Sequence, residues 1–407
     1  MAITVIKGFQ CAPLLLSFSA MIATDLYNLD SLLSEEQKLI RNTIKTWVNQ
    51  SIKPVIEDCF VNGKALEGLA SDLAEIGAFG FIFSEEYGGL NMDFVSYGLL
   101  MQELERGDSS IRVMASIQTS LVMHAISEFG SKEQKDEYLH KLASGEYLGA
   151  FGLTEPNFGS NPSGMHSYYK EEGDNIVLNG SKMWIGNSEI ADIAIVWMKD
   201  ERGHIKGVIV DRHKITNYNS TTFQDKWSFR ASKTGELIFS NSTLPRNQVL
   251  AKSTSIKDAY QCLNIGRYAV ACGGVGIALE CFELALQYSK ERIQFGLPIG
   301  SKQLIQKKLA EMSTEITKGQ LLVFHLGKLM DSGTFSHEQI SLAKRNNVRM
   351  AQDVARSARE ILGGMGISSD YPIMRHLINT ETLVTYQGTN EIHELILGKA
   401  LTGFDAF

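Results

Sequence analysis

The hydrophobic pattern divides the chain into three parts. From 30 to 149, apolar residues such as Leu39, Ile40 and Ile44 recur every three or four positions, which predicts amphipathic helices. Between 150 and 254 the helical period gives way to short β-branched runs. It returns from 255 to 407, over stretches longer than most globular helices.

The middle part predicts a compact antiparallel β-domain. Residues 193–197 form an apolar β-branched run, and turn pairs such as Asn179-Gly180 and Arg202-Gly203 separate such runs. The order of helices, strands and long helices indicates an α+β fold, since a Rossmann sheet would need alternating strands and helices. We therefore expect a helical domain at 30–149, a β-domain at 150–254 and a helical bundle at 255–407, preceded by an extension at 1–29.

Composition fits an ordinary soluble globular protein. With 407 residues, of which 44% are hydrophobic, the chain can bury a core in two or three domains. A net charge of -7 gives no electrostatic reason to expect nucleic acid or an anionic membrane as a partner.

The cysteines favour a reducing compartment and no metal. The five cysteines are scattered without a C-x-x-C pair, and no metal-binding histidine pattern is present. We expect a cytoplasmic protein, or one of the mitochondrial matrix if the source is eukaryotic.

The first residues are compatible with a weak signal peptide. An apolar run at 12–20 follows a single lysine, but it is shorter than a membrane span, and the next arginine is Arg41. A poorly ordered tail or a misassigned start before Met21 is the favoured interpretation.

Four motifs identify a family. Residues 148–165 read LGAFGLTEPNFGSNPSGM, 179–188 read NGSKMWIGNS, 292–296 read RIQFG and 386–392 read YQGTNEI. In this order they resemble the flavin-binding signatures of acyl-CoA dehydrogenases. Within that family, the segment at 103–124 resembles the glutaryl-CoA dehydrogenases in particular.

The resemblance implies three domains, with the last a four-helix bundle, and a homotetramer that binds FAD across a subunit boundary. Short polar groups and close backbone approach suit such a site. For Trp184, a core aromatic on a strand is the alternative. The resemblance implies these cofactor-binding residues: Phe151, Leu153, Thr154, Gly159, Ser160, Trp184, Gly186, Arg292, Gln294, Phe295, Gln303, Gly363, Gly364, Gly366 and Thr389.

Substrate binding is expected to involve an acyl thioester on CoA or on an acyl carrier protein. In glutaryl-CoA dehydrogenases the arginine and serine that match Arg112 and Ser116 pair with the distal carboxylate of the substrate. A planar guanidinium selects a carboxylate well. The alternative for Arg112 is a helix-end salt bridge with Asp108 or Glu105. The resemblance adds Ser160 and Arg267 to the substrate-binding set.

The catalytic position departs from the family. Gln387 stands where the family keeps the glutamate that removes the α-proton, and an amide cannot accept that proton. Other superfamily members place the base just before the arginine that Arg267 resembles, where this chain has Gly266. Glu105 and two acidic residues after Gln387, Glu391 and Glu394, are the remaining candidates.

A second departure is Gly186, where relatives usually have a threonine whose hydroxyl bonds near flavin N5. Its loss is expected to alter flavin redox tuning or to open space above N5.

Three hypotheses follow. The leading one is a flavoenzyme that acts with non-standard chemistry on a short, carboxylated, glutaryl-like acyl thioester. A flavin oxidase or monooxygenase of the same fold is the second. The third is a catalytically silent thioester-binding flavoprotein, or an engineered Glu-to-Gln variant of a glutaryl-CoA dehydrogenase-like enzyme.

Overall fold

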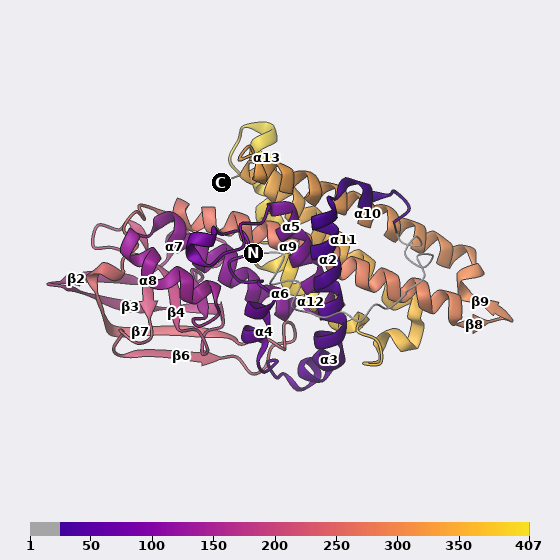
Figure 1. Cartoon of the computed structure of the whole chain (residues 1–407), viewed down its shortest axis with the longest axis horizontal. Helices are drawn as coiled ribbons and strands as arrows, with labels where there is room; N and C mark the ends of the chain where they lie inside the picture. Colours follow the sequence, from indigo (N-terminus) through magenta and orange to yellow (C-terminus); the bar gives the residue numbers. More distant parts are fainter. Residues whose placement is uncertain (1–24, 407) are drawn as a thin grey trace.

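A computed structural model describes residues 25–406. Most of the predicted N-terminal extension, with its apolar run, lies outside the described residues. The described chain forms a helical region, a sheet and a second helical region of long helices (Figure 1).

The N-terminal region is a set of short helices. Ser34 begins the first of them with a capping box, since its hydroxyl accepts from the Gln37 amide and the Gln37 side chain accepts from the Ser34 amide. Two stretches of π-helix, Val48–Ile52 and Ile117–Met123, interrupt the helical path. The α-helices are α2 (Glu35–Trp47), α3 (Lys53–Asn62), α4 (Leu69–Glu75), α5 (Phe94–Gly107), α6 (Ser109–Ser116), α7 (His124–Phe129) and α8 (Lys132–Ala143).

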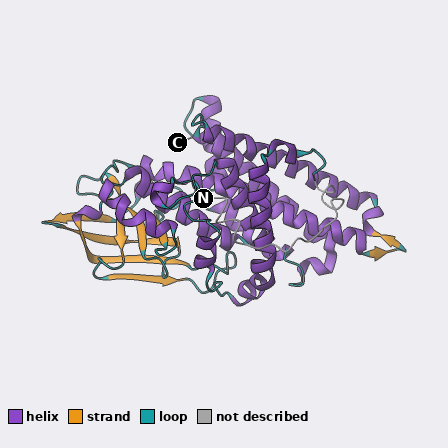
Figure 2. Cartoon of the chain, in the orientation of Figure 1, coloured by secondary structure: helices purple, strands orange, loops and turns teal. Residues whose placement is uncertain are grey.

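A seven-stranded sheet follows, at one end of the molecule (Figure 2). The order along the sheet is β1-β4-β2-β3-β7-β6, and β5 pairs with β4. The strands are β1 (Gly149–Gly152), β2 (Tyr168–Glu172), β3 (Asn175–Gly186), β4 (Ile193–Lys199), β5 (Ile205–Asp211), β6 (Tyr218–Thr222) and β7 (Thr234–Pro245).

The sheet is mixed, which corrects the expectation of an antiparallel β-domain. The hairpin pairs β2/β3 and β4/β5 are antiparallel, whereas β1 and β2 each pair parallel with β4. Alternation of apolar and polar residues shows that a segment is a strand but not the direction of its partner. Here a long connection containing the β2/β3 hairpin separates β1 from β4 and permits the parallel pairing.

The C-terminal region is a bundle of long helices. Between the first two of them projects a small hairpin, β8 (Ile293–Gln294) and β9 (Leu297–Pro298). In Figure 1 this hairpin and the large sheet lie at opposite ends of the molecule. The helices are α9 (Ile256–Glu291), α10 (Gln303–Asp331), α11 (His337–Leu362), α12 (Ile373–Thr385) and α13 (Asn390–Thr402).

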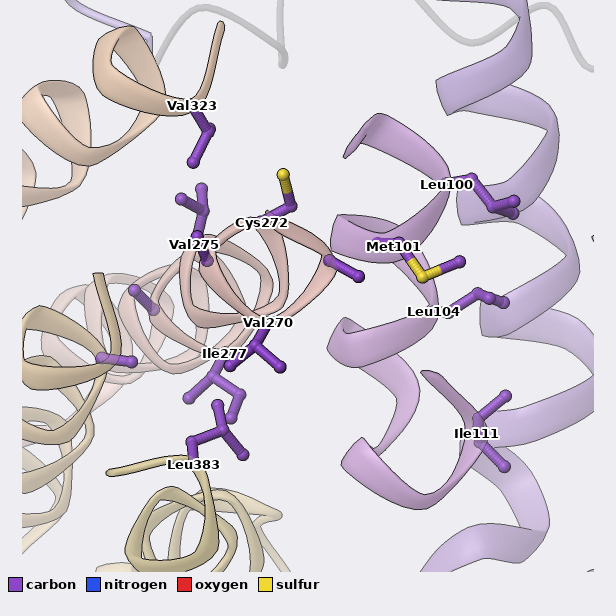
Figure 3. Close-up of a cluster of buried hydrophobic side chains, with 14 of the residues drawn as sticks. Leu100, Met101, Leu104, Ile111, Val270, Cys272, Val275, Ile277, Val323 and Leu383 are labelled. Atoms are coloured by element: carbon purple, nitrogen blue, oxygen red, sulfur yellow. The ribbon is translucent and has the colours of Figure 1, made fainter. Parts of the chain in front are cut away.

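Helix α9 lies at the centre of the main core. Figure 3 shows its side chains Val270, Cys272 and Val275 among those of α5 and of neighbouring C-terminal helices. It is the one described helix long and apolar enough to cross a membrane, but 83% of its most apolar window is buried inside the protein. Its apolar character on all sides is therefore that of a central core helix.

Candidate active site

Gln387 lies in a tight turn between α12 and α13. Its φ of 55° is left-handed, and Gly388 follows with a φ of 89°. A Cβ at Gly388 would lie 3.0 Å from His393 Nε2, so the turn needs a glycine there for both conformation and space.

The turn brings the two expected base positions together. A Cβ at Gly266 on α9 would lie 3.2 Å from Gln387 Oε1 and 3.3 Å from Gln387 Nε2. Gln387 Oε1 is buried and has no hydrogen-bond partner among the described residues. An amide and a glycine thus share the place where either expected base would lie.

The other candidate bases are either paired with an arginine or exposed. Glu394 pairs with Arg345 at 2.8 Å, and Glu391 is exposed in the first turn of α13. Glu105 is fully buried in an ion pair with Arg112.

Three basic side chains surround the backbone of the turn. Arg267 Nε donates to the Gln387 carbonyl at 3.0 Å, and His393 Nε2 lies 3.2 Å from the same oxygen. Lys344 Nζ donates to the Gly388 carbonyl at 2.8 Å. All three side chains are buried.

Burial shifts the pKa values of these groups. It lowers the pKa of Arg267 to about 10 and, with the Arg267 charge, that of Lys344 to about 7. Burial and the two neighbouring cations lower the pKa of His393 to about 3, so this imidazole is neutral at pH 7.

Arg112 is engaged by three protein side chains. Its guanidinium bonds the Glu105 carboxylate and the Tyr386 hydroxyl, and Nη1 donates to Ser116 Oγ at 3.2 Å. Burial alone would lower the arginine pKa, but the Glu105 charge outweighs it and raises that pKa. The ion-pair alternative is therefore present in the structure, with Glu105 as the partner, while Asp108 pairs with Arg375 at 2.6 Å.

The loop after β1 carries Thr154, Gly159 and Ser160. Its start is fixed by a buried ion pair, in which Lys182 Nζ donates to Glu155 Oε1 at 2.8 Å and to the Leu153 carbonyl at 3.2 Å. Glu155 also accepts from the backbone amides of His166 and Ser167.

These interactions hold Glu155 ionised and the loop ordered. Burial opposes ionisation, but Lys182 and the hydrogen bonds lower the pKa of Glu155 to about 2. Gly159 and Ser160 remain exposed at the loop surface, whereas Phe151 and Leu153 are buried beside it.

Trp184 is not a core aromatic. A bulge between Met183 and Ile185 gives it a φ of 63°, and 61% of its surface is exposed beside Phe223. This contradicts the core alternative, because the ring is turned away from the sheet interior. It fits a residue that packs against a bound ring or a second subunit.

Gly186 does not leave open space. A Cβ at this position would lie 2.5 Å from Ile117 Cδ1. The expectation that this glycine opens space is therefore wrong at the position that a side chain would take. The Ile117 side chain, carried by the π-helical segment, fills that position.

The other predicted cofactor residues belong to the C-terminal helical region. Arg292, Gln294 and Phe295 form the exposed β8/β9 hairpin, and Gln303 begins α10 close behind it. Gly363 and Gly364 are exposed at the end of α11, whereas Gly366 is buried. Thr389 caps α13 by accepting from the Ile392 amide at 3.3 Å.

One chain therefore presents two separate sets of predicted cofactor residues. The set around Thr154 and Trp184 is near the sheet, and the hairpin set is at the opposite end in Figure 1. Trp184 and the hairpin are both exposed, but a single copy does not bring them together.

Sequence reasoning missed Lys344, His393 and the role of Tyr386. Lys344 lies in a helix with many polar residues, where a lysine usually faces solvent. The Tyr386 signal was available, since the residue adjoins Gln387, but its contact with Arg112 joins residues 274 positions apart.

Comparison with known proteins covers all three regions. Residues 34–146, 150–242 and 256–402 match the family models of the acyl-CoA dehydrogenase N-terminal, middle and C-terminal domains. The chain belongs to the acyl-CoA dehydrogenase family. The expected α+β fold and an FAD-dependent oxidoreductase of this family are thereby confirmed.

Relatives of this acyl-CoA dehydrogenase family member align along most of its length. An acyl-CoA dehydrogenase of Bacillus subtilis (strain 168) is 34% identical, covering 91% of this chain and 99% of the relative. A glutaryl-CoA dehydrogenase of Desulfococcus multivorans is 31% identical over 91% of this chain and 97% of its own.

Solved structures of glutaryl-CoA dehydrogenase are similar as well. One from Mycobacterium smegmatis is 44% identical with a TM-score of 0.91, covering 93% of this chain and 97% of that one. Another from the same organism, in complex with FADH2, is 40% identical with a TM-score of 0.92, covering 94% and 99%.

No group of three or more metal-ligating side chains occurs among residues 25–406. The cysteines in this range, Cys59, Cys262, Cys272 and Cys281, are free thiols.

Proposed function

We propose that this chain is an FAD-dependent oxidoreductase of a short, carboxylated acyl-CoA thioester, and that it lacks the usual proton-abstracting base. The observation that carries the proposal is the contact between Gln387 and Gly266, which leaves an amide where a carboxylate would act. The glutaryl-CoA dehydrogenase relatives support the substrate class.

FAD would be held by two copies of the chain. The Thr154 loop and the exposed Trp184 ring would bind the isoalloxazine, and the Arg292–Phe295 hairpin of another copy would bind the phosphates. A homotetramer, as expected for the family, would supply that second copy. When bound, FAD would supply the hydride acceptor for the substrate β-carbon.

The thioester arm has a suitable surface beside this loop. A hollow of about 480 Å³ begins at Met165 and His166 and continues to the β4/β5 turn, with Lys170 and Lys199 in its wall. Its volume is in the range of small-molecule sites. The two lysines would face phosphate groups there, beside the carboxylates of Asp200 and Glu201 that line the same hollow. Coenzyme A and a carrier-bound phosphopantetheine arm share this chemistry, so parallel assays with each thioester would separate them.

The Arg112 cluster supports a carboxylated substrate. Ser116 and Tyr386 contact the same guanidinium, and Tyr386 immediately precedes Gln387. A distal carboxylate would compete with or join Glu105 on a guanidinium that is already positioned. Arg267 would act on the turn and not directly on the acyl group.

The decisive test compares the native protein with Gln387→Glu. Both holoenzymes are mixed anaerobically with glutaryl-CoA or butyryl-CoA, and the loss of flavin absorbance is followed. Because general-base catalysis contributes about 10²–10⁴ in rate, Gln387→Glu should bleach the flavin faster by about that factor. Gln387→Asn is the matched control and should gain nothing.

Equal rates for the native protein and Gln387→Glu would contradict the absence of the usual base. A gain with glutaryl-CoA but not with butyryl-CoA would support the carboxylated substrate, and the reverse preference would count against it.

A further inference from the structure

The Gln387–Gly388 turn is held by donors that act on its carbonyl groups. Two successive residues have positive φ values, and the first of them is not glycine. Such a conformation is strained for a non-glycine residue and persists where the surroundings over-determine it. Here the surroundings are Arg267 and His393 on the first carbonyl and Lys344 on the second.

Lys344 is the least expected of these donors. Its side chain has no exposed surface, and its Nζ donates a single hydrogen bond of 2.8 Å, to the Gly388 carbonyl. No carboxylate lies within ion-pair distance of it or of Arg267 among residues 25–406, and Glu391, which attracts it from α13, is exposed. Burial of this amine without a counter-charge is costly and lowers its pKa to about 7, so global stability does not explain this lysine.

We infer that Lys344 is a positioning residue, which holds the Gly388 carbonyl and thereby directs the Gln387 side chain toward Gly266. It acts from α11, while Arg267 acts from α9, so the turn is fixed from two helices of the bundle. The inference rests on the proposed function only in that Gln387 faces the substrate.

The hydrogen bonds that fix the turn are followed directly by those that cap α13. Thr389 follows Gly388 directly, and it accepts from the Ile392 amide through its hydroxyl and from the His393 amide through its carbonyl. Loosening the turn should therefore fray the first turn of α13, and displace Gln387 from Gly266, before the rest of the bundle is affected.

Hydrogen exchange tests this without reference to catalysis. In the purified holoenzyme, Lys344→Met keeps the length of the side chain but removes the donor. The amides of Ile392 and His393 should exchange at least ten-fold faster, with the rest of the chain unchanged and the melting temperature equal or higher. Lys344→Arg should restore slow exchange, and the control Lys318→Met, at an exposed position on α10, should change nothing.

Kinetics provides a second readout in the Gln387→Glu background. Because a misplacement of about 1 Å can cost 100-fold in rate, adding Lys344→Met should lower kcat by about 10- to 100-fold with little change in KM. Unchanged exchange at Ile392 and His393 would overturn the inference. Faster exchange across the whole chain with a lower melting temperature would also overturn it, in favour of a general structural role.

If Lys344→Met does not fold, Lys344→Gln, which retains a donor, is measured in its place. Folding with native exchange would support a positioning hydrogen bond, and failure to fold would show a structural role. If Gln387→Glu gains no turnover, the proposed function fails while the exchange result still decides the role of Lys344.

Discussion

Arg112 and Arg267 are both buried arginines near the Tyr386–Gly388 segment, but only Arg112 has a carboxylate as a partner. Arg112 has a buried carboxylate, a hydroxyl and a phenol as partners. Arg267 bonds one backbone carbonyl, and its pKa is lowered, whereas that of Arg112 is raised. The charge of Arg112 is thus compensated by Glu105, while on the side nearest Gln387 the Arg267 guanidinium is buried without a counter-charge.

The uncompensated side is where the family resemblance implies a glutamate. A carboxylate at 387 would supply a counter-charge that Gln387 does not provide to Arg267 and Lys344. Relative to the carboxylates that the resemblance implies at these positions, Gln387 and Gly266 would change the charge of the site as well as its proton chemistry.

The largest expected effect is at the paired arginine. Arg112→Met leaves Glu105 buried and unpaired, so the free energy of unfolding should fall by about 3–5 kcal/mol. Urea denaturation of the holoenzyme measures it. The control Arg349→Met removes an exposed pair with Asp353 and should change stability by less than about 0.5 kcal/mol. A loss below about 1 kcal/mol for Arg112→Met would show that the ion pair with Glu105 does not set Arg112 apart from Arg267 in its contribution to stability.

The buried Lys182–Glu155 pair extends the comparison to the β-domain. Glu155→Gln keeps the shape but removes the charge, so stability at pH 7 should fall by about 2 kcal/mol. The pKa of Glu155 is lowered from its ordinary 4.5 to about 2. Its ionisation therefore contributes stability above pH 4.5, and that contribution is lost as the pH falls from 4.5 toward 2.

Melting curves between pH 7 and pH 2 check this prediction. The native protein and Glu155→Gln should differ most above pH 4.5 and converge as the pH falls toward 2. Glu315→Gln, at an exposed pair with Lys318, is the matched control and should run parallel to the native curve. A constant gap down to pH 2 would show that the charge is not the cause.

The smallest stability effect is expected for Arg267→Met. It removes one hydrogen bond to the Gln387 carbonyl but also ends the burial of an uncompensated charge, so the net loss should be about 1 kcal/mol or less. Urea denaturation beside Arg112→Met provides the direct comparison. A loss as large as that of Arg112→Met would mean that Arg267 is compensated by a partner after all.

The local chemistry of the site was predictable only in part. The sequence located Gln387, Gly266 and Arg112 through motifs, because those segments are short and their residue types are distinctive. It could not pair Arg112 with Glu105 in preference to Asp108, since both carboxylates lie within two helical turns of it and only packing against α12 assigns Asp108 to Arg375.

The exposure of side chains was a second limit. Trp184 belongs to a strand whose pattern is compatible with a core aromatic, yet the bulge at this position turns it outward. Gly186 suggested open space, which Ile117 fills from a helix almost 70 positions earlier in the chain.

The sequence by itself determined the order of helices, strands and long helices, the family and the glutamine at 387, because periodicity and motifs are local properties of the chain. The tertiary structure alone decided which charges are compensated, how the turn at Gln387 is held and that the two sets of predicted cofactor residues lie apart. Those properties depend on groups distant in sequence, such as Lys344 and Gly388, that become neighbours only when the helices pack.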